Sequence, residues 1–353
     1  MNPPNTFLLY GANGYTARLI LEKTAQFGLN PILCGRDEGK LRPLAEQYGL
    51  AYRVADLTNE IALNNALRDV PVVLHCAGPF SKTALPMQQA CLRNGVHYLD
   101  ITGEVAVFEQ GAAMDRQARE RGVMLMSGVG FDVVPTDCLA QYLYHKLPDA
   151  TYLQLAFTNE GGSLSHGTAQ TAVDNLGQGG LVRENGKLTT VPYAHKVLNV
   201  TFANGQTIPC MSIPWGDVST AFYTTGILNI ETFIGSTPGS IRMAKLGNSF
   251  NWLLRRKSVQ QWVSQQVTKR VTGPDEATRT KAKTQVWGRV GNKNGKTVEA
   301  RLTGPEGYTL TALSALIITK KVLRGCVKPG FQTPAGLYGG DLVLEIDGVT
   351  RQG

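Results

Sequence analysis

The first third of the chain alternates short apolar runs with longer segments whose apolar positions recur every three or four residues. The short runs predict buried strands at 7–10, 31–34, 51–54, 72–76, 98–101 and 123–126. The longer segments predict helices at 17–27, 38–48, 60–68, 84–94 and 105–120. Glycines 28, 49 and 95 follow three of these helices, as C-terminal glycine caps do. Such alternation predicts a parallel, doubly wound sheet of the Rossmann type, an α/β fold.

The pattern changes after Pro135. Residues 152–235 and 284–302 alternate apolar and polar positions, with Asn-Gly turns at 185–186, 204–205 and 294–295. This predicts a second α+β domain built on a mainly antiparallel sheet. A late apolar helix is expected at 310–323. We therefore predict a Rossmann domain at 1–135, a substrate or dimerisation domain at 136–308, and a C-terminal helix and tail at 309–353 that pack back on the first domain.

The first strand runs directly into Gly11 and Gly14, and a helix follows. Two glycines there allow a sharp turn and a close approach of the backbone to a pyrophosphate, whose charge would lie at the helix N-terminus. Ala17 is small enough for that helix to lie close on the sheet. The competing interpretation is an ordinary strand-helix turn whose glycines serve only packing.

The end of the second strand indicates which dinucleotide binds. An NAD site carries an acid about 20 residues past the turn, whereas the first charged side chain here is Arg36. A guanidinium suits a 2′-phosphate. We therefore expect NADP as the cofactor.

The composition of the chain narrows the classes of protein to which it can belong. The chain has 353 residues, of which 42% are hydrophobic, and a net charge of +8. No apolar run approaches the ~18 residues of a membrane span, and the N-terminus lacks a signal-peptide layout, so we expect a cytoplasmic protein. The six cysteines lack metal-ligand spacing, which predicts neither a zinc site nor a disulfide framework. Because the basic residues are dispersed, an anionic cofactor or membrane surface fits the charge better than nucleic acid.

Residues 250–271 are the exception to this dispersion. Apolar positions recur at helical spacing, and basic residues flank them at both ends. This is the pattern of an interfacial membrane helix, and it is also the pattern of an ordinary packed helix. Both interpretations stay open, and a lipid-like substrate would favour peripheral membrane contact.

Three loops follow strands whose carboxyl ends meet at one edge of the predicted sheet, where a Rossmann fold binds its ligands. The loop 76–80 is small and turn-forming. The loop 100–104 carries two acids, of which Glu104 fits a role at the start of the next helix better than a catalytic one. The loop 128–132 ends in Asp132, which could bind substrate or ribose or cap the helix near Pro135.

The second domain offers Ser165 and His166 ahead of a predicted helix. His166 could donate a proton to the atom opposite the hydride acceptor, although most lone histidines are structural. His75 and His97 lie in strand patterns and are expected to be structural. The catalytic candidates are therefore Asp132, Ser165 and His166.

Several segments together resemble the saccharopine dehydrogenase-like oxidoreductases, in particular the branch that contains trans-acting enoyl reductases. The matching segments are 11–17, 34–37 with Lys40 and Leu41, 76–80, 98–104 and 130–135, with weaker matches at 307–312 and 332–336. The resemblance implies an NADP-binding Rossmann domain and reduction of a C=N, C=O or activated C=C bond. The cofactor-binding residues are then expected to be Gly11, Asn13, Gly14, Tyr15, Thr16, Arg36, Lys40, Asp56, Ala77, Gly78, Pro79 and Phe80.

Together these features predict an NADPH-dependent reductase that transfers hydride to an unsaturated, carbonyl or imine substrate, acyl or lipid-like in character. No arginine cluster matches a dicarboxylic amino-acid pocket, so saccharopine itself is not expected as the substrate. The alternative is a non-catalytic NADP(H)-binding sensor or scaffold at a membrane surface. We also expect a homo-oligomer, no metal and no nucleic-acid partner.

Overall fold

The computed structural model of the chain describes residues 5–161, 173, 177–270 and 273–353. The chain divides into two units. Unit 1 comprises Met1–Val134 with Tyr308–Leu337, and unit 2 comprises Pro135–Gly307 with Tyr338–Gly353. We predicted that the whole region 309–353 packs on the first domain. Its helix belongs to unit 1, whereas its tail belongs to unit 2.

Unit 1 is built on a seven-stranded sheet in the order β15-β6-β5-β4-β1-β2-β3, and every neighbouring pair is parallel. Its strands are β1 (Thr6–Tyr10), β2 (Asn30–Gly35), β3 (Tyr52–Val54), β4 (Val72–His75), β5 (His97–Asp100), β6 (Met124–Met126) and β15 (Gly330–Phe331). The predicted Rossmann-type sheet is confirmed. Strand order reverses between β1 and β4, so their carboxyl ends form the switch point at which such sheets bind ligands.

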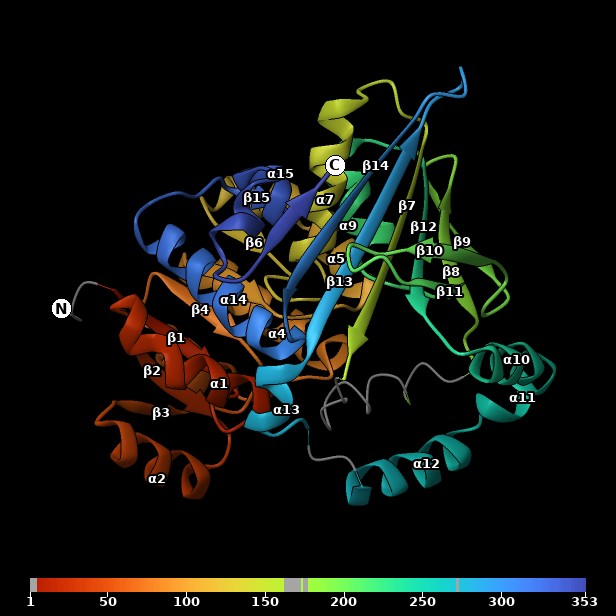
Figure 1. The fold of residues 1–353 in the computed structure, drawn as a ribbon. Helices are drawn as coiled ribbons and strands as arrows, with labels where there is room; N and C mark the ends of the chain where they lie inside the picture. Colours follow the sequence, from red (N-terminus) through yellow and green to blue (C-terminus); the bar gives the residue numbers. More distant parts are fainter. Residues whose placement is uncertain (1–4, 162–172, 174–176, 271–272) are drawn as a thin grey trace. The chain divides into compact units, whose positions relative to one another are not determined.

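Helices alternate with these strands as predicted (Figure 1). They are α1 (Tyr15–Lys23), α2 (Glu38–Tyr48), α3 (Glu60–Leu67), α4 (Phe80–Asn94), α5 (Val105–Ala113), α6 (Asp115–Glu120), α14 (Gly307–Leu323) and α15 (Pro334–Tyr338). The three predicted glycine caps are left-handed, with φ of 65° at Gly28, 64° at Gly49 and 68° at Gly95. The predicted helix at 105–120 is divided at Met114. Figure 1 shows α14 and β15, drawn in blue, beside the early elements of this unit.

Unit 2 carries a nine-stranded sheet whose main path is β10-β11-β12-β7-β13-β14-β16, with β8 paired to β12 and β9 paired to β8. Its strands are β7 (Tyr152–Glu160), β8 (Gly180–Glu184), β9 (Lys187–Val191), β10 (Val197–Thr201), β11 (Thr207–Ser212), β12 (Asn229–Gly235), β13 (Lys283–Gly291), β14 (Thr297–Pro305) and β16 (Thr350–Gln352). All pairs are antiparallel except β7–β12. The prediction of a mainly antiparallel sheet is confirmed, and the parallel pair was not foreseen.

The described helices of unit 2 are α7 (Val134–Lys146), α9 (Asp217–Thr225), α10 (Pro238–Gly247), α11 (Asn251–Leu254), α12 (Lys257–Arg270) and α13 (Glu276–Lys281). Helix α7 packs closely on the sheet at Gly288, where a Cβ atom would lie only 2.7 Å from a methyl group of Leu143. Among the described residues, no helix is both long enough and apolar enough to cross a bilayer.

Candidate functional site

The glycine turn lies where the loops after β1 and β4 meet. The Gly11 amide donates to the carbonyl of Cys34 at 2.8 Å, and the Gly14 amide donates to the carbonyl of Gly11 at 2.9 Å. Gly11 has a φ of 80°, and a Cβ there would lie 2.8 Å from the backbone nitrogen of Ala77. Both the left-handed conformation and the close approach therefore require glycine at position 11.

Gly14 occupies the N-cap position of α1 and has no side chain to cap the helix amides. A Cβ at Gly14 would lie 3.2 Å from the Gly11 carbonyl oxygen. Ala17 is buried on the sheet side of this helix. The N-cap residue thus leaves the first amides of the helix without a side-chain cap, which suits a phosphate.

Arg36 is exposed and directly follows β2. Within the described part of the chain it has no ion-pair partner. The neighbouring Asp37 caps α2 by accepting from the Lys40 amide at 3.3 Å, and its carboxylate lies 3.6 Å from the Lys40 ammonium. Of the two predicted cations, Arg36 is therefore the one whose charge is left for a ligand.

Asp56 is held by its own turn. It accepts from the Thr58 hydroxyl at 2.6 Å and from the Thr58 amide at 2.8 Å. These hydrogen bonds, and then the charge of Arg36, keep the pKa of Asp56 below its usual value. The carboxylate is thus ionised near Arg36, and it shapes the loop after β3.

The loop 76–80 is fixed from two sides. The Thr83 hydroxyl donates to the Ala77 carbonyl at 2.7 Å. Glu104 accepts from the Phe80 amide at 2.7 Å and from the Ser81 amide at 2.9 Å. Glu104 therefore caps α4, the helix before it in the chain, whereas we expected it to complement the helix that follows. It makes no side-chain cap to α5.

Asp100 joins the loops after β5 and β6. Its carboxylate, fully buried, accepts from the Tyr98 hydroxyl at 2.7 Å and from the amides of Thr102 and Gly128 at 3.0 and 2.9 Å. Burial raises the pKa of Asp100 to about 6, and these hydrogen bonds limit the rise. The residue holds two of the three predicted site loops together.

Asp132 lies against Gly103, because a Cβ at Gly103 would be 2.5 Å from the Asp132 carboxylate. Burial raises the pKa of Asp132 to about 7, and the nearby charge of Glu104 adds to the rise. No described residue donates a hydrogen bond to this carboxylate. A perturbed acid at the carboxyl edge of a Rossmann sheet is a candidate for proton transfer.

Helix α14 supports the loop that ends in Asp132. The Phe131 amide donates to the Thr311 hydroxyl at 2.9 Å, and the Ser314 hydroxyl donates to the Val129 carbonyl at 2.7 Å. A helix far away in the sequence thus holds a predicted site loop in place. Ser165 and His166 fall outside the described residues.

Two histidines have structural surroundings, as expected. His75 is fully buried among aromatic rings, and burial lowers its pKa to about 3. The Nδ1 atom of His97 accepts from the Met124 amide at 3.1 Å. Within the described ranges, no group of three or more His, Cys, Asp or Glu side chains could hold a metal ion.

Comparison with known proteins agrees with this geometry. Residues 7–126 match the saccharopine dehydrogenase NADP binding domain. The chain is 31% identical over 188 residues to a lipid droplet localized protein of Caenorhabditis elegans, covering 48% of this chain and 44% of that protein. It is 31% identical over 162 residues to a trans-acting enoyl reductase of Mycobacterium ulcerans, covering 43% and 38%.

A third relative is the human saccharopine dehydrogenase-like oxidoreductase, 26% identical over 199 residues, covering 49% of this chain and 46% of that protein. The chain thus spans less than half the length of these curated relatives. Its whole fold is shared with apo saccharopine dehydrogenase (L-Glu forming) from Saccharomyces cerevisiae, with a TM-score of 0.67, 13% identity and 99% of both chains covered. The predicted resemblance is confirmed: residues 7–126 match the NADP binding domain of the saccharopine dehydrogenase family.

Proposed function

We propose that this protein is an NADPH-dependent reductase that acts on an unsaturated or carbonyl group of an apolar, acyl or lipid-like substrate. The observation that carries the proposal is the partly buried Asp132, with a pKa near 7, at the ligand-binding edge of an NADP-binding sheet. The relatives named as an enoyl reductase and a lipid droplet protein support the substrate class.

The cofactor would lie along the turn from Gly11 to Gly14, with its pyrophosphate at the N-terminus of α1. Arg36 would hold the 2′-phosphate, since its guanidinium has no ion pair in the described part of the chain. The remaining cofactor residues, including Asn13, Tyr15, Thr16 and the loop from Ala77 to Phe80, stay predictions. When bound, NADPH supplies the hydride.

Asp132 would supply the proton. A carboxyl group with a pKa near 7 is substantially protonated at neutral pH, so it can donate to the atom next to the carbon that accepts hydride. Glu104 tunes this acid because its negative charge disfavours the ionised form of Asp132. Its own carboxylate is held in place by the first amides of α4. Ser165 and His166 stay predictions.

The test is NADPH consumption with a panel of enoyl thioesters, long-chain ketones and imines, using the full chain and its Asp132→Asn variant. We expect one substrate class to be reduced, with kcat falling about 100-fold in the variant while NADPH affinity is unchanged. Turnover that is undiminished in Asp132→Asn would remove the residue from the mechanism. Tight NADPH binding without turnover of any class would favour the alternative, a non-catalytic NADP(H)-binding sensor.

A surface of unit 2 supports peripheral contact with a lipid surface. Five large apolar side chains between α10 and α12 are strongly exposed: Met243 (71%), Leu246 (62%), Phe250 (55%), Trp252 (62%) and Trp262 (63%). Exposed basic residues at 255–257 lie among them in sequence. Aromatic and aliphatic side chains beside basic ones suit an interface with anionic lipid. We call these five residues the apolar surface.

The segment that carries the apolar surface is bonded to residues that flank strands β8 and β9. Asn248 donates to the Tyr193 carbonyl at 2.9 Å and accepts from the Tyr193 amide at 3.0 Å. Arg255 donates to the Gly177 carbonyl at 2.8 Å. A lipid-bound segment would therefore hold the unit at the surface where a lipid-like substrate resides. The homo-oligomer predicted from the sequence stays a prediction.

A further inference from the structure

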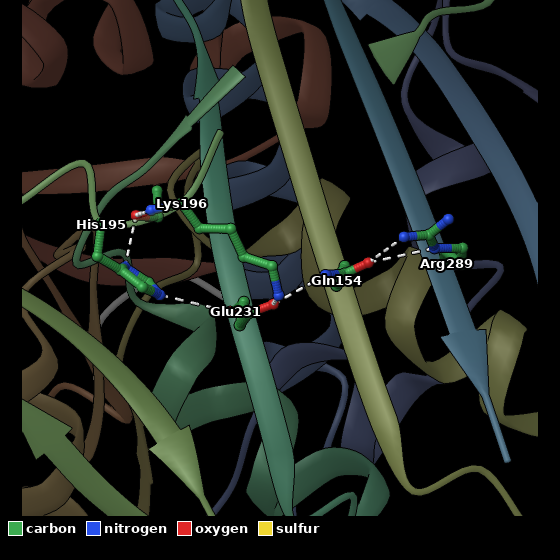
Figure 2. Close-up of polar contacts among 6 residues, drawn as sticks. Gln154, His195, Lys196, Glu231 and Arg289 are labelled. Atoms are coloured by element: carbon green, nitrogen blue, oxygen red, sulfur yellow. Dashed lines mark hydrogen bonds and ion pairs between the residues drawn. The ribbon is translucent and has the colours of Figure 1, made fainter. Parts of the chain in front are cut away.

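Three neighbouring strands of unit 2 place polar side chains in one row. Glu231 on β12 is opposite Gln154 on β7, and Gln154 is opposite Arg289 on β13. Partners that lie opposite one another in a sheet share a face, so the three side chains lie side by side. Figure 2 shows this row, with His195 and Lys196 next to Glu231.

Gln154 links the carboxylate of Glu231 to the guanidinium of Arg289. Its Nε2 donates to Glu231 Oε2 at 2.8 Å, and its Oε1 accepts from Arg289 Nη2 at 2.6 Å and from Arg289 Nε at 3.2 Å (Figure 2). The amide is 6% exposed. Because its nitrogen faces a carboxylate and its oxygen faces a guanidinium, only this orientation of the amide is compatible with its neighbours.

Glu231 is fully engaged. Lys196 Nζ donates to Glu231 Oε2 at 2.7 Å, and His195 Nε2 lies 3.5 Å from Glu231 Oε1. The other ring nitrogen of His195 is 2.7 Å from the Ser212 hydroxyl. Burial opposes ionisation of Glu231, yet the bonds from Lys196 and Gln154 hold its pKa below the usual value. The carboxylate is therefore a fixed anchor for Lys196.

Among the described residues, Arg289 makes only a long ion pair, with a carboxylate that it shares with Arg301. Its Nε and Nη2 are directed at the neutral oxygen of Gln154, and the nearest acid, Glu299, is 4.0 Å from Nη1. Glu299 also accepts from Arg301 at 3.1 Å. Three cations, Lys196, Arg289 and Arg301, thus share two carboxylates, Glu231 and Glu299. One positive charge is left over, and a partly buried excess charge favours a bound anion.

A cavity of about 380 Å³ adjoins this excess charge. Lys196, Arg289, Glu231 and Tyr152 line it, and Arg183 and Glu184 add one charge of each sign to its wall, so the lining carries three cations and two carboxylates. Arg183 donates to the carbonyls of Val218 and Gly186 at 2.6 and 2.8 Å, so its guanidinium is already engaged. The volume is in the range of small-ligand sites.

We propose that this cavity binds the carboxylate or phosphate group of a small organic anion, with Lys196 Nζ and the Arg289 guanidinium as the recognising groups. An ammonium has three donors and a guanidinium five, so both groups retain donors after their bonds to Glu231 and Gln154. Tyr152 lies in the same wall, and its ring crosses the place where a Cβ of Gly291 would be. This gives the ligand a flat apolar contact. The inference does not depend on the proposed reductase activity.

The test is calorimetric titration of the full chain with inorganic phosphate and with octanoate at constant ionic strength. We expect at least one probe to bind saturably, and Lys196→Gln and Arg289→Gln each to weaken it roughly 10- to 100-fold. Lys283→Gln is the matched control, because Lys283 is an exposed residue of the same strand β13 and lies outside the cavity. The affinity of the Lys283→Gln variant for the bound probe should equal that of the wild type. Arg36→Glu should also leave binding unchanged, which separates this site from the glycine turn.

The two probes distinguish the sources of the anion: octanoate alone indicates an acyl carboxylate, and phosphate alone indicates a phosphate ester. Fluorescence of Trp287 gives a second readout, since the Arg289 guanidinium is 5.4 Å from its ring. If Arg289→Gln fails to fold, Lys196→Gln decides the question, because Lys196 is half exposed. Absence of saturable binding by both probes, or equal affinity in the wild type and Lys196→Gln, would overturn the proposal.

Discussion

The carboxylate of Glu104 accepts a 2.7 Å hydrogen bond from the backbone amide of Phe80, so the loop after β5 holds the loop after β4 in place. The same carboxylate raises the pKa of Asp132 by its charge. Glu104 therefore has two effects on the carboxyl edge of the sheet: it caps α4, and it makes the neighbouring acid harder to ionise. The two effects can be measured separately.

Glu104→Gln should lower the pKa of Asp132 from about 7, because the variant removes a negative charge that disfavours ionisation. The measurement is a carbon NMR titration of the Asp132 carboxyl, assigned with Asp132→Asn. Glu120→Gln, a change of an exposed acid on α6, is the control and should leave the value unchanged. An unaltered pKa in Glu104→Gln would mean that burial alone perturbs Asp132.

Asp132→Asn should stabilise the protein at pH 8 and leave its stability nearly unchanged at pH 4. Folding raises the pKa of this group from 3.8 to about 7, so the unfolded chain loses the proton first as pH rises. The native state is therefore penalised progressively between about pH 4 and pH 7, and fully above that range. At about 1.4 kcal/mol per pKa unit, a shift of this size corresponds to a penalty of about 4 kcal/mol.

Chemical denaturation at the two pH values measures this effect. Asp347→Asn changes an exposed acid of the tail and should have no effect at either pH. Equal denaturation midpoints for the wild type and Asp132→Asn at pH 8 would show that Asp132 titrates as an ordinary carboxyl group.

Substitutions at the two glycines of the turn should impair different properties, stability at Gly11 and NADPH binding at Gly14. Gly11→Ala places a side chain in a left-handed conformation and 2.8 Å from Ala77, so it should destabilise the fold by about 2–4 kcal/mol. Gly14 has an ordinary φ of −72°, so Gly14→Val should fold yet lose NADPH binding. Melting curves and calorimetry distinguish the two outcomes. Unchanged NADPH affinity in Gly14→Val would place the pyrophosphate elsewhere.

The apolar surface should bind anionic vesicles. Trp252→Ser and Trp262→Ser should each weaken partitioning to phosphatidylserine-containing vesicles about tenfold, because each exposed indole can enter the interface. Flotation with vesicles measures this. Ile61→Ser, which changes an exposed side chain of unit 1, should have no effect. Partitioning that is equally weak in the wild type and in both variants would rule out this surface as a membrane contact.

The sequence predicted unit 1 well because its signals are local. Glycine caps, strand-helix alternation and the position of Arg36 after β2 all depend on neighbours in the chain. Glu104 lies at the start of α5 as predicted, but the hydrogen bonds of its side chain were not foreseen, because they reach back 23 and 24 residues to α4. The network around Asp100 likewise depends on contacts between loops.

Unit 2 was harder to predict. Helix α9 was missed because it is rich in Thr, Phe, Tyr and Val, which favour strands, although Gly216 and Gly226 flank it. The alternation of apolar and polar residues shows which face of a sheet a residue occupies. It does not show whether the neighbouring strand runs parallel or antiparallel, so the parallel pair β7–β12 was not foreseen. The row from Glu231 to Arg289 depends on the register of three strands, and register is not readable from any one of them.

The most direct test of the account is the affinity of the full chain for NADPH and NADH, measured by calorimetry for the wild type and Arg36→Glu at the same ionic strength. Arg42→Gln, a change of an exposed residue on α2 that pairs with Glu38, is the control. We predict that the wild type prefers NADPH and that Arg36→Glu weakens NADPH by about 1.5–3 kcal/mol with little effect on NADH. Equal affinities for both nucleotides in the wild type would contradict the account.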